Sequence, residues 1–175
     1  ATVSRINEPW VADELIANGK TDICMIGRPN LCDSEFANKA KEGRIDDIRP
    51  CIGCGRCLTG IMMGKRISCT VNPSVEDDTI APAETKKKVL VIGGGPAGME
   101  AAYVAKKRGH EVVLCEKSNE LGGQLRLAAV PIAKQELCKV IKFMIRRLDH
   151  EGVEVRLNTE VTKEMLENEF KDYEI

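Results

Sequence analysis

Four cysteines stand close together in CIGCGRCLTGIMMGKRISC, the stretch of residues 51–69. Cys51, Cys54 and Cys57 follow a C-x2-C-x2-C spacing, and Cys69 comes twelve residues after the third of them. This spacing suits an iron–sulfur cube, because successive thiolates each reach a different iron corner and a more distant cysteine takes the fourth. The glycines between the ligands let backbone N–H groups approach the cluster sulfurs. The stretch therefore predicts a [4Fe-4S] cluster.

Zinc and disulfide bonds are the alternatives for these thiols. A structural zinc site usually takes two C-x2-C pairs, or one pair with histidines, separated by a longer loop. The second pair is missing, and the two histidines, His110 and His150, lie far along the sequence. The N-terminus lacks the pattern of a secretion signal, which predicts a cytoplasmic protein whose thiols stay reduced. The sequence thus favours the cluster, with zinc as the main alternative.

The hexapeptide GGGPAG, residues 93–98, carries a second candidate chemistry. It directly follows a predicted strand and opens a predicted helix, as a dinucleotide-binding turn does. In such a turn Gly93 permits the sharp bend, Gly95 lets the backbone approach a pyrophosphate, and Gly98 lets the helix pack closely on the strand. Ala97 belongs to the same turn. The unpaired N–H groups at the start of the helix favour the phosphate charges.

An acidic residue, Glu116, follows the next predicted strand, eighteen residues beyond Gly98. Its carboxylate can accept both hydroxyls of an adenosine ribose and would repel a 2′-phosphate, so FAD or NAD fits better than NADP. The sequence ELGGQL then adds a second glycine pair, which includes Gly123 and precedes Gln124. A glycine loop there can pass beneath the pyrophosphate of a long dinucleotide such as FAD, and an ordinary surface turn is the alternative.

The elements that must position these residues fall into three predicted segments, 1–43, 44–85 and 86–175. In the last segment, strands are predicted at 89–92 and 112–115 and in VEVRLN, with helices at 96–107 and around 137–148. Strands that alternate with helices predict an α/β fold with a parallel sheet. The middle segment follows the cysteines with a polar, proline-containing stretch, which predicts an extended linker.

The first segment also alternates helix and strand. The sequence predicts a helix capped by Asn7 and ended by Gly19, then a strand at 23–26 that Gly27-Arg28-Pro29 stops. A second helix, capped by Asp33 and ended by Gly43, follows. One strand cannot form a sheet, so we expect its partners to lie elsewhere.

Composition excludes several classes of partner. The 175 residues carry 26 basic and 27 acidic side chains and few aromatic ones, so neither nucleic acid nor a membrane is expected as a partner. No apolar run approaches the length of a membrane span. The remaining cysteines are predicted to fill the core or lie on the surface, with no redox role: Cys24, Cys32, Cys115 and Cys138.

With the cysteine cluster and the glycine turn in this order, the chain resembles the old-yellow-enzyme-like iron–sulfur flavoproteins, the family of 2,4-dienoyl-CoA reductase and trimethylamine dehydrogenase. The resemblance covers essentially all of the chain. SRINEPWVADELIANGKTDICMIGRPNLCDSEFANKAKEGRIDDIRPCIGC is similar to the end of that family's TIM barrel running into its cluster. NPSVEDD is similar to the exit from the cluster, and VLVIGGGPAGMEAA with CEKSNELGGQL to the FAD- or ADP-binding domain. The expected fold is therefore the end of a TIM barrel, a cluster segment and an incomplete Rossmann-like βαβ domain.

The resemblance also implies roles for individual residues. Gly27 and Arg28 would bind the phosphate of FMN, and Arg5 in SRIN would face the same flavin. Val161 resembles the position whose backbone meets the adenine. The four cysteines of residues 51–69 would ligate one [4Fe-4S] cluster. The family's proton donors and substrate pocket lie in barrel strands that this sequence omits, so no catalytic residue is expected here.

The implied function is an electron relay in a longer polypeptide, which would pass electrons from NAD(P)H through FAD and [4Fe-4S] to FMN. Reduction of an activated, enoyl-type carbon–carbon double bond is the expected outcome, with a small-molecule substrate bound by the missing barrel and the rest of the parent chain as partner. An amine-dehydrogenase-like member and a non-catalytic module that binds ADP and a cluster are the alternatives. A homo-oligomer is left open.

Overall fold

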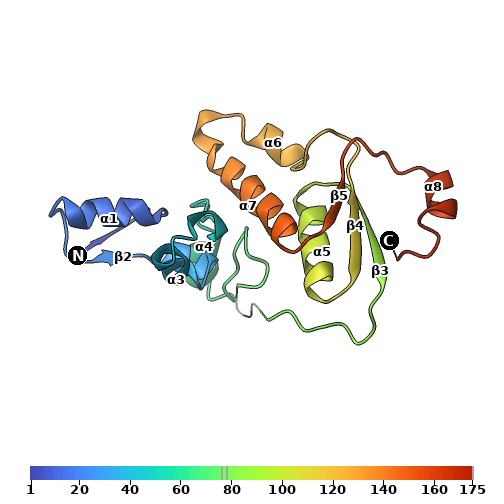
Figure 1. The fold of residues 1–175 in the computed structure, drawn as a ribbon. Coiled ribbons are helices and arrows are strands. Elements are labelled where there is room, and N and C mark those ends of the chain that lie inside the picture. The colour runs from blue at the N-terminus through green and yellow to red at the C-terminus, as the bar shows by residue number, and fades with distance from the viewer. Residues whose placement is uncertain (76, 78, 175) are drawn as a thin grey trace. The chain divides into compact units, whose positions relative to one another are not determined.

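A computed structural model describes residues 1–75, 77 and 79–174 (Figure 1). The chain divides into two compact units, Ala1–Asp78 and Thr79–Ile175. Each unit contains its own parallel sheet, so the α/β class predicted from the sequence is confirmed. The segment boundaries predicted at 43/44 and 85/86 remain predictions. The linker predicted after the cysteines includes residues 76 and 78, which lie outside the described residues.

The first unit begins with a small βαβ arrangement. Strand β1 (Thr2–Val3) pairs in parallel with β2 (Cys24–Met25), and helix α1 (Pro9–Ala17) connects them. Parallel neighbours need such a crossover, because a short hairpin can only join antiparallel strands. The sequence predicted the second strand two residues longer and did not predict β1, its partner.

The helices of the first unit depart from the prediction in three places. Helix α1 starts after Glu8 without a side-chain cap, so the predicted Asn7 cap is wrong; the amide of Asn7 donates to a distant carbonyl instead. A short helix follows β2 where a loop was predicted, because Pro29 lies in its first turn and does not end it. The predicted helix at 33–43 begins only at Phe36. The remaining elements of this unit are α2 (Arg28–Cys32), α3 (Phe36–Lys41), the 3₁₀ turn η1 (Ile45–Asp47) and α4 (Arg56–Met62).

Asp33 organises this helical part although it is not the cap of α3. The N-cap position is Glu35, and the Asp33 carboxylate accepts the Glu35 N–H at 3.0 Å just before the helix. The same buried carboxylate accepts the Arg49 N–H at 2.7 Å and pairs with Lys39 at 2.7 Å. These bonds hold the chain that enters the cysteine stretch against the α2–α3 turn.

The second unit is a three-stranded parallel sheet, β3–β4–β5. Near the end of the chain Glu174 bridges Val89 in parallel, on the edge of β3 that β4 leaves open. With that bridge the order follows the dinucleotide-binding arrangement, in which the first strand lies between the second and the fourth. Its elements are β3 (Lys88–Ile92), α5 (Pro96–Lys107), β4 (Glu111–Cys115), α6 (Gln124–Ala128), η2 (Ile132–Lys134), α7 (Glu136–His150), β5 (Glu154–Arg156) and α8 (Lys163–Asn168).

Alternate side chains of the strands bury opposite faces of this sheet. Val112 and Leu114 pack with Met99 of α5 and Leu148 of α7 on one face. On the other face Leu90, Val113 and Cys115 pack with Phe170, beyond α8. Figure 1 shows α5 and α7 on one side of the sheet and α8 on the other. Burial on both faces is typical of parallel sheets, and it explains the continuous apolar run of β4.

Within the part of the chain that the structure describes, no helix combines the length and the apolar character needed to cross a membrane.

Candidate functional site

The four predicted cluster cysteines line one cavity in the first unit. Cys51, Cys54, Cys57 and Cys69 are free thiols there, and the cavity is partly open to solvent. Arg28 lines the same cavity. The structure thus brings together cysteines that are up to eighteen residues apart in the sequence, from the 51–57 turn and from the loop around Cys69.

Two glycines give the turn its shape. Gly53 has φ +65° and Gly55 has φ +75°, values that L side chains rarely adopt, so the sequence needs glycine at both positions. Gly55 is also the N-cap residue of α4, which places Cys57 in the first turn of that helix. The Gly53 N–H donates to the Cys51 sulfur, as expected for a loop that supplies N–H groups to thiolates.

The loop around Cys69 is fastened to the same helix and turn. Arg56 Nε donates to Ser68 Oγ at 3.0 Å, and the hydroxyl of Thr70 lies 3.2 Å from Cys54 Sγ. These contacts hold the fourth cysteine across the cavity from the first three.

The environment favours a thiolate at Cys69. A hydrogen bond from the Cys32 thiol and the backbone N–H groups of Val71 and Asn72 lower the pKa of Cys69 to about 6, against the effect of burial. The same sulfur–sulfur hydrogen bond, together with burial, raises the pKa of Cys32 well above its ordinary value. Burial also raises the pKa of Cys51, partly offset by the Gly53 N–H.

A cluster and a single metal ion require different spacings of the four thiols. Among the described residues, no three His, Cys, Asp or Glu side chains converge closely enough to hold one metal ion. Zinc would require sulfurs about 3.8 Å apart, from tetrahedral Zn–S bonds of about 2.3 Å. In a cube each thiolate binds a separate iron, so the ligands stand further apart around a shared cavity. The structure shows that the four cysteines share one cavity, and the kind of metal centre they would hold stays a prediction.

Arg5 and Asn7 reach the cysteine turn from the segment after β1. Asn7 Nδ2 donates to the Cys51 carbonyl at 3.2 Å, and Arg5 Nε lies 3.9 Å from the place where a Cβ on Gly53 would stand. Ser4 and Arg5 have φ values of +96° and +51°, in the left-handed region that non-glycine residues avoid. Strain of this kind persists where the surroundings fix the backbone, and it often marks functional sites.

Gly27 and Arg28, predicted to bind a flavin phosphate, lie at the start of α2. Gly27 is the N-cap residue, with open space beside its Cα, and Arg28 is the first helical residue. The positive charge of Arg28 also acts on Cys51, in the direction that favours its thiolate. The structure therefore places Arg28 beside the cysteine cavity, and its contact with a flavin stays a prediction.

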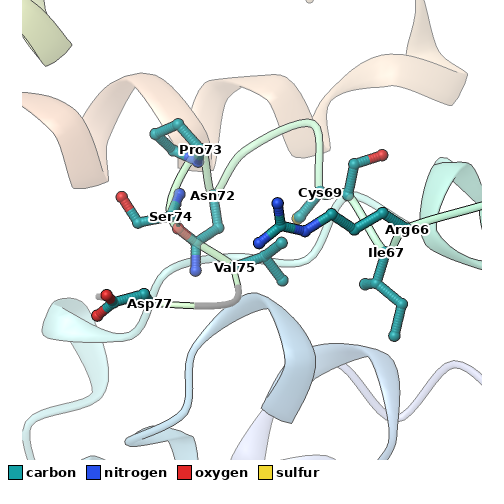
Figure 2. Close-up of a pocket in the computed structure, with 9 residues that line it drawn as sticks. Arg66, Ile67, Cys69, Asn72, Pro73, Ser74, Val75 and Asp77 are labelled. Carbon is teal, nitrogen blue, oxygen red and sulfur yellow. Dashed lines mark hydrogen bonds between the residues drawn. The ribbon is translucent and has the colours of Figure 1, made fainter. Parts of the chain in front are cut away.

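A second, more polar pocket of about 390 Å³ is lined by Cys69 and by residues that precede and follow it in the chain (Figure 2). Figure 2 shows the side chains of Arg66 and Asn72 in this pocket. Asn72 is buried, donates from Nδ2 to the Cys32 carbonyl at 3.1 Å, and accepts the Ser74 N–H at 2.9 Å. The pocket thus lies against the network that fixes the Cys69 loop.

The glycine turn of the second unit has the close packing that its sequence predicts. A Cβ on Gly98 would lie 1.9 Å from the Gly93 carbonyl oxygen, so no side chain fits between helix and strand. Gly93 has φ +101°, which gives the sharp bend. Gly95 caps α5, and a Cβ there would meet nothing within 4 Å, so this position is open to a ligand. Ala97 lies in the first turn of the helix that the phosphate would face.

Glu116 lies at the end of β4 with its carboxylate fixed by three donors. Oε2 accepts the Gly94 N–H at 2.6 Å, and Oε1 accepts the N–H and the hydroxyl of Ser118, each at 2.8 Å. The Ser118 N–H, the Gly94 N–H and the Ser118 hydroxyl lower the pKa of Glu116. The single Ser118 hydrogen can turn to the Glu120 carbonyl, also at 2.8 Å, which leaves carboxylate lone pairs for ribose hydroxyls.

The second glycine pair lies directly beside the first turn. The Gly122 N–H donates to the Gly94 carbonyl at 2.8 Å, and a Cβ on Gly123 would stand 3.2 Å from Gly95 Cα. Gln124 is the first residue of α6, which follows this loop. Val161 packs on the α8 face of the sheet with the cluster around Phe170. The two loops therefore form one continuous glycine-lined edge at the carboxyl end of β3.

Comparisons with known proteins agree with both halves of this arrangement. Residues 88–171 match the family described as FAD dependent oxidoreductase. The chain is 42% identical to an NADH oxidase of Thermoanaerobacter brockii over 99% of its length, which is 28% of that protein. It matches a solved 2-naphthoyl-CoA reductase with a TM-score of 0.89 and 37% identity, over 95% of this chain and 26% of the other. The chain belongs to the old-yellow-enzyme-like iron–sulfur flavoprotein family.

A further solved member, the histamine dehydrogenase from Rhizobium sp. 4-9, has a TM-score of 0.84 and 31% identity over 93% of this chain and 25% of the other. The chain spans about a quarter of the length of the relatives it matches. Membership of the iron–sulfur flavoprotein family confirms the resemblance inferred from the sequence. The assignments of individual ligands and nucleotide contacts remain predictions.

Sequence reasoning missed several residues of the two sites. Cys32 had no paired spacing, yet its thiol contacts Cys69. Asn7 resembled a helix cap and contacts Cys51 instead. Ser118 carried a weak signal, since a serine two residues beyond an acid can form a local side-chain turn.

Proposed function

We propose that the chain is the relay part of a longer iron–sulfur flavoprotein oxidoreductase. In this proposal Cys51, Cys54, Cys57 and Cys69 hold one [4Fe-4S] cluster, the second unit holds FAD, and Gly27, Arg28 and Arg5 contact FMN at the end of a TIM barrel. The observation that carries the proposal is the single cavity lined by all four cysteines. The parallel β1–α1–β2 arrangement supports the barrel end, since such barrels consist of β–α–β repeats.

The proposed reaction takes electrons from NAD(P)H and delivers them to an activated, enoyl-type carbon–carbon double bond. A cluster supplies single-electron transfer between flavins when it is bound. The chain's own residues orient the groups: Glu116 fixes the ribose, and Gly95 admits the pyrophosphate at the start of α5. The cysteine turn and the Cys69 loop enclose the cluster from two sides. The names of the NADH oxidase and the 2-naphthoyl-CoA reductase support this direction.

The partners follow from the same proposal. A small-molecule substrate binds in the barrel of the longer polypeptide, and neither nucleic acid nor a membrane takes part. We place the protein in the cytoplasm, where its eight free cysteines stay reduced. A homo-oligomer is compatible with this function.

A second candidate is an amine dehydrogenase, in which electrons leave an amine substrate at FMN. The likeness to a histamine dehydrogenase favours it. The two candidates share the cofactors that this chain would bind and differ in the barrel, so the substrate decides between them.

The test uses the complete polypeptide, purified without oxygen and titrated with NADH. Loss of the absorbance of a bound flavin on addition of NADH, followed by its recovery with an enoyl-type acceptor, supports the reductase. Flavin that an amine reduces and NADH does not supports the dehydrogenase. A preparation that holds ADP and no FAD, and whose absorbance changes with neither NADH nor an amine, would show a non-catalytic module and contradict the proposal.

A further inference from the structure

One arginine fastens the second glycine loop of the nucleotide edge. Arg126 lies in α6, which follows the loop of Leu121, Gly122 and Gly123, and its side chain folds back over that loop. Its Nε donates to the Leu121 carbonyl, and its Nη1 pairs with Glu120 Oε2 at 3.0 Å. A Cβ on Gly122 would lie 3.1 Å from Arg126 Cγ, so the stem of the arginine packs directly against the loop backbone.

The same loop contacts the turn that would take the pyrophosphate. The Gly122 N–H donates to the Gly94 carbonyl at 2.8 Å, and a Cβ on Gly123 would stand 3.2 Å from Gly95 Cα. The buried side chain of Leu121 fills the space beside Gly94, where a Cβ would lie 2.3 Å from it. A continuous series of contacts therefore runs from the arginine through this loop to the turn.

The backbone of the loop is of a kind that benefits from such a fastening. Gly122 has φ +113° and Gly123 has φ +50°, conformations that glycine enters and leaves with little steric cost. Glycine loses more conformational freedom on ordering than other residues, so an unfastened loop would lose that freedom when a ligand binds. A side chain that holds the loop in the empty protein removes this entropy cost from binding.

We propose that Arg126 is a positioning residue that fixes the second glycine loop against Gly95 and thereby strengthens binding of the pyrophosphate of FAD. The inference rests on the proposed function, because it requires a dinucleotide in the second unit. The bond to the Leu121 carbonyl matters more than the ion pair with Glu120, since that pair is half-exposed and exposed pairs contribute little. Arg126 itself does not contact the nucleotide.

The experiment measures the affinity of the complete polypeptide, freed of FAD, for FAD, ADP and adenosine. Arg126→Met keeps the stem that packs on Gly122 and removes both donors. We expect it to bind FAD and ADP about three- to tenfold more weakly, the range expected for a lost hydrogen bond. Adenosine lacks the pyrophosphate, so it should bind to the variant as it binds to the wild type.

Two further variants separate positioning from direct contact. Arg126→Lys keeps the charge but has one amine in place of the separate Nε and Nη1 donors, so it should bind FAD about two- to threefold more weakly. Glu120→Gln removes the ion pair and leaves the bond to Leu121, so its FAD affinity should stay within about twofold of the wild type. Arg108→Met is the matched control: it removes an exposed arginine at the opposite end of α5 and should bind all three ligands like the wild type.

The outcomes separate the inference from the function beneath it. Equal FAD affinity in the wild type, Arg126→Met and Arg126→Lys overturns the inference alone. Adenosine affinity that falls as far as FAD affinity would show a general effect on the fold and would also overturn it. A several-fold gain of FAD affinity in Glu120→Gln would mean that the released guanidinium contacts the pyrophosphate, which contradicts a positioning role.

Two results remain to be assigned. If Arg126→Met does not fold, the Arg126→Lys protein carries the test. A wild type that binds neither FAD nor ADP overturns the proposed function and the inference together.

Discussion

Asn7 connects the segment after β1 to the cysteine turn through one side-chain amide. Its Nδ2 donates to the Cys51 carbonyl, while its Oδ1 is buried without a hydrogen-bond partner among the described residues. A buried amide oxygen without a partner costs stability, whereas the Nδ2 atom of the same amide is hydrogen-bonded. Here that atom fixes the backbone of the first proposed ligand.

Replacement of Asn7 tests this role. We expect Asn7→Ala to release iron about fivefold faster than the wild type when a chelator is added, because the Cys51 carbonyl loses its donor. Asn7→Asp should behave similarly, since an ionised carboxylate cannot donate. Asn38→Ala, which removes an exposed amide that bonds to Glu35, is the control and should match the wild type. Equal rates for all four proteins would contradict the role of Asn7.

Glu116 makes the stability of the second unit depend on pH in one direction. Its donors lower the pKa of the folded carboxyl below the value of about 4.3 in an unfolded chain. The folded state is therefore stabilised above that value, and the stabilisation is lost as the pH falls through the lower, folded pKa. Below both pKa values the carboxyl of Glu116 is protonated in the folded and in the unfolded chain, so its charge no longer contributes to stability.

We expect the wild type to lose more unfolding free energy than Glu116→Gln when the pH falls from about 6 to 3. Urea unfolding followed by circular dichroism at several pH values measures the difference. Glu160→Gln, at an exposed position, is the control and should follow the wild type. A Glu116→Gln protein with the same or a steeper pH dependence would show that the carboxylate is not stabilised as the structure indicates.

At the scale of elements, two positions of the glycine turn have different expected roles: Gly98 is needed for folding, and Gly95 is needed for nucleotide binding. Gly98→Ala places a Cβ 1.9 Å from the Gly93 oxygen, and we expect it to lower the unfolding free energy by about 3 kcal/mol. Gly95→Ala has open space and φ −72°, so it should fold like the wild type. Its methyl group would meet an approaching pyrophosphate, and FAD affinity should fall at least about tenfold.

Thermal unfolding and flavin fluorescence titration distinguish these two effects. If Gly95→Ala binds FAD like the wild type, the pyrophosphate does not approach this turn. If Gly98→Ala is as stable as the wild type, the close contact between α5 and β3 is not required for folding.

The elements of the second unit could be predicted from sequence because their signals are local. The predicted helix at 96–107 is confirmed at both ends, since Gly95 and Pro96 start it and Gly109 follows its end. The elements of the first unit were harder to predict, because their contacts join residues that are far apart in the sequence. Thr2 pairs with Cys24, and Asn7 contacts Cys51 across 44 positions, so neither pattern is visible in a short window.

The same distinction applies to the candidate sites. The three closely spaced cysteines and the glycine turn are sequence patterns whose spacing reflects the chemistry directly. Cys32 is different, because only the packing of α2 against the Cys69 loop brings its thiol to the site. A residue that only packing brings to a site has no fixed spacing from the other residues there, and a single sequence cannot reveal it.

At the scale of the whole molecule, two compact units each carry a different candidate site on one chain. A cysteine-lined cavity alone would suit a zinc-stabilised module, and a glycine turn alone would suit many nucleotide-binding proteins. The relatives match nearly the whole chain, so the similarity extends over both candidate sites. The account therefore depends most on what the four cysteines bind.

Iron, zinc and acid-labile sulfide contents of the anaerobically purified protein test this point most directly. The account predicts iron and sulfide in equal amounts, about four of each per chain as a [4Fe-4S] cluster requires. Cys57→Ser should lose most of both, while Cys138→Ser, at an exposed cysteine outside the cavity, should retain them. Zinc bound by the wild type, with neither iron nor sulfide, would contradict the account.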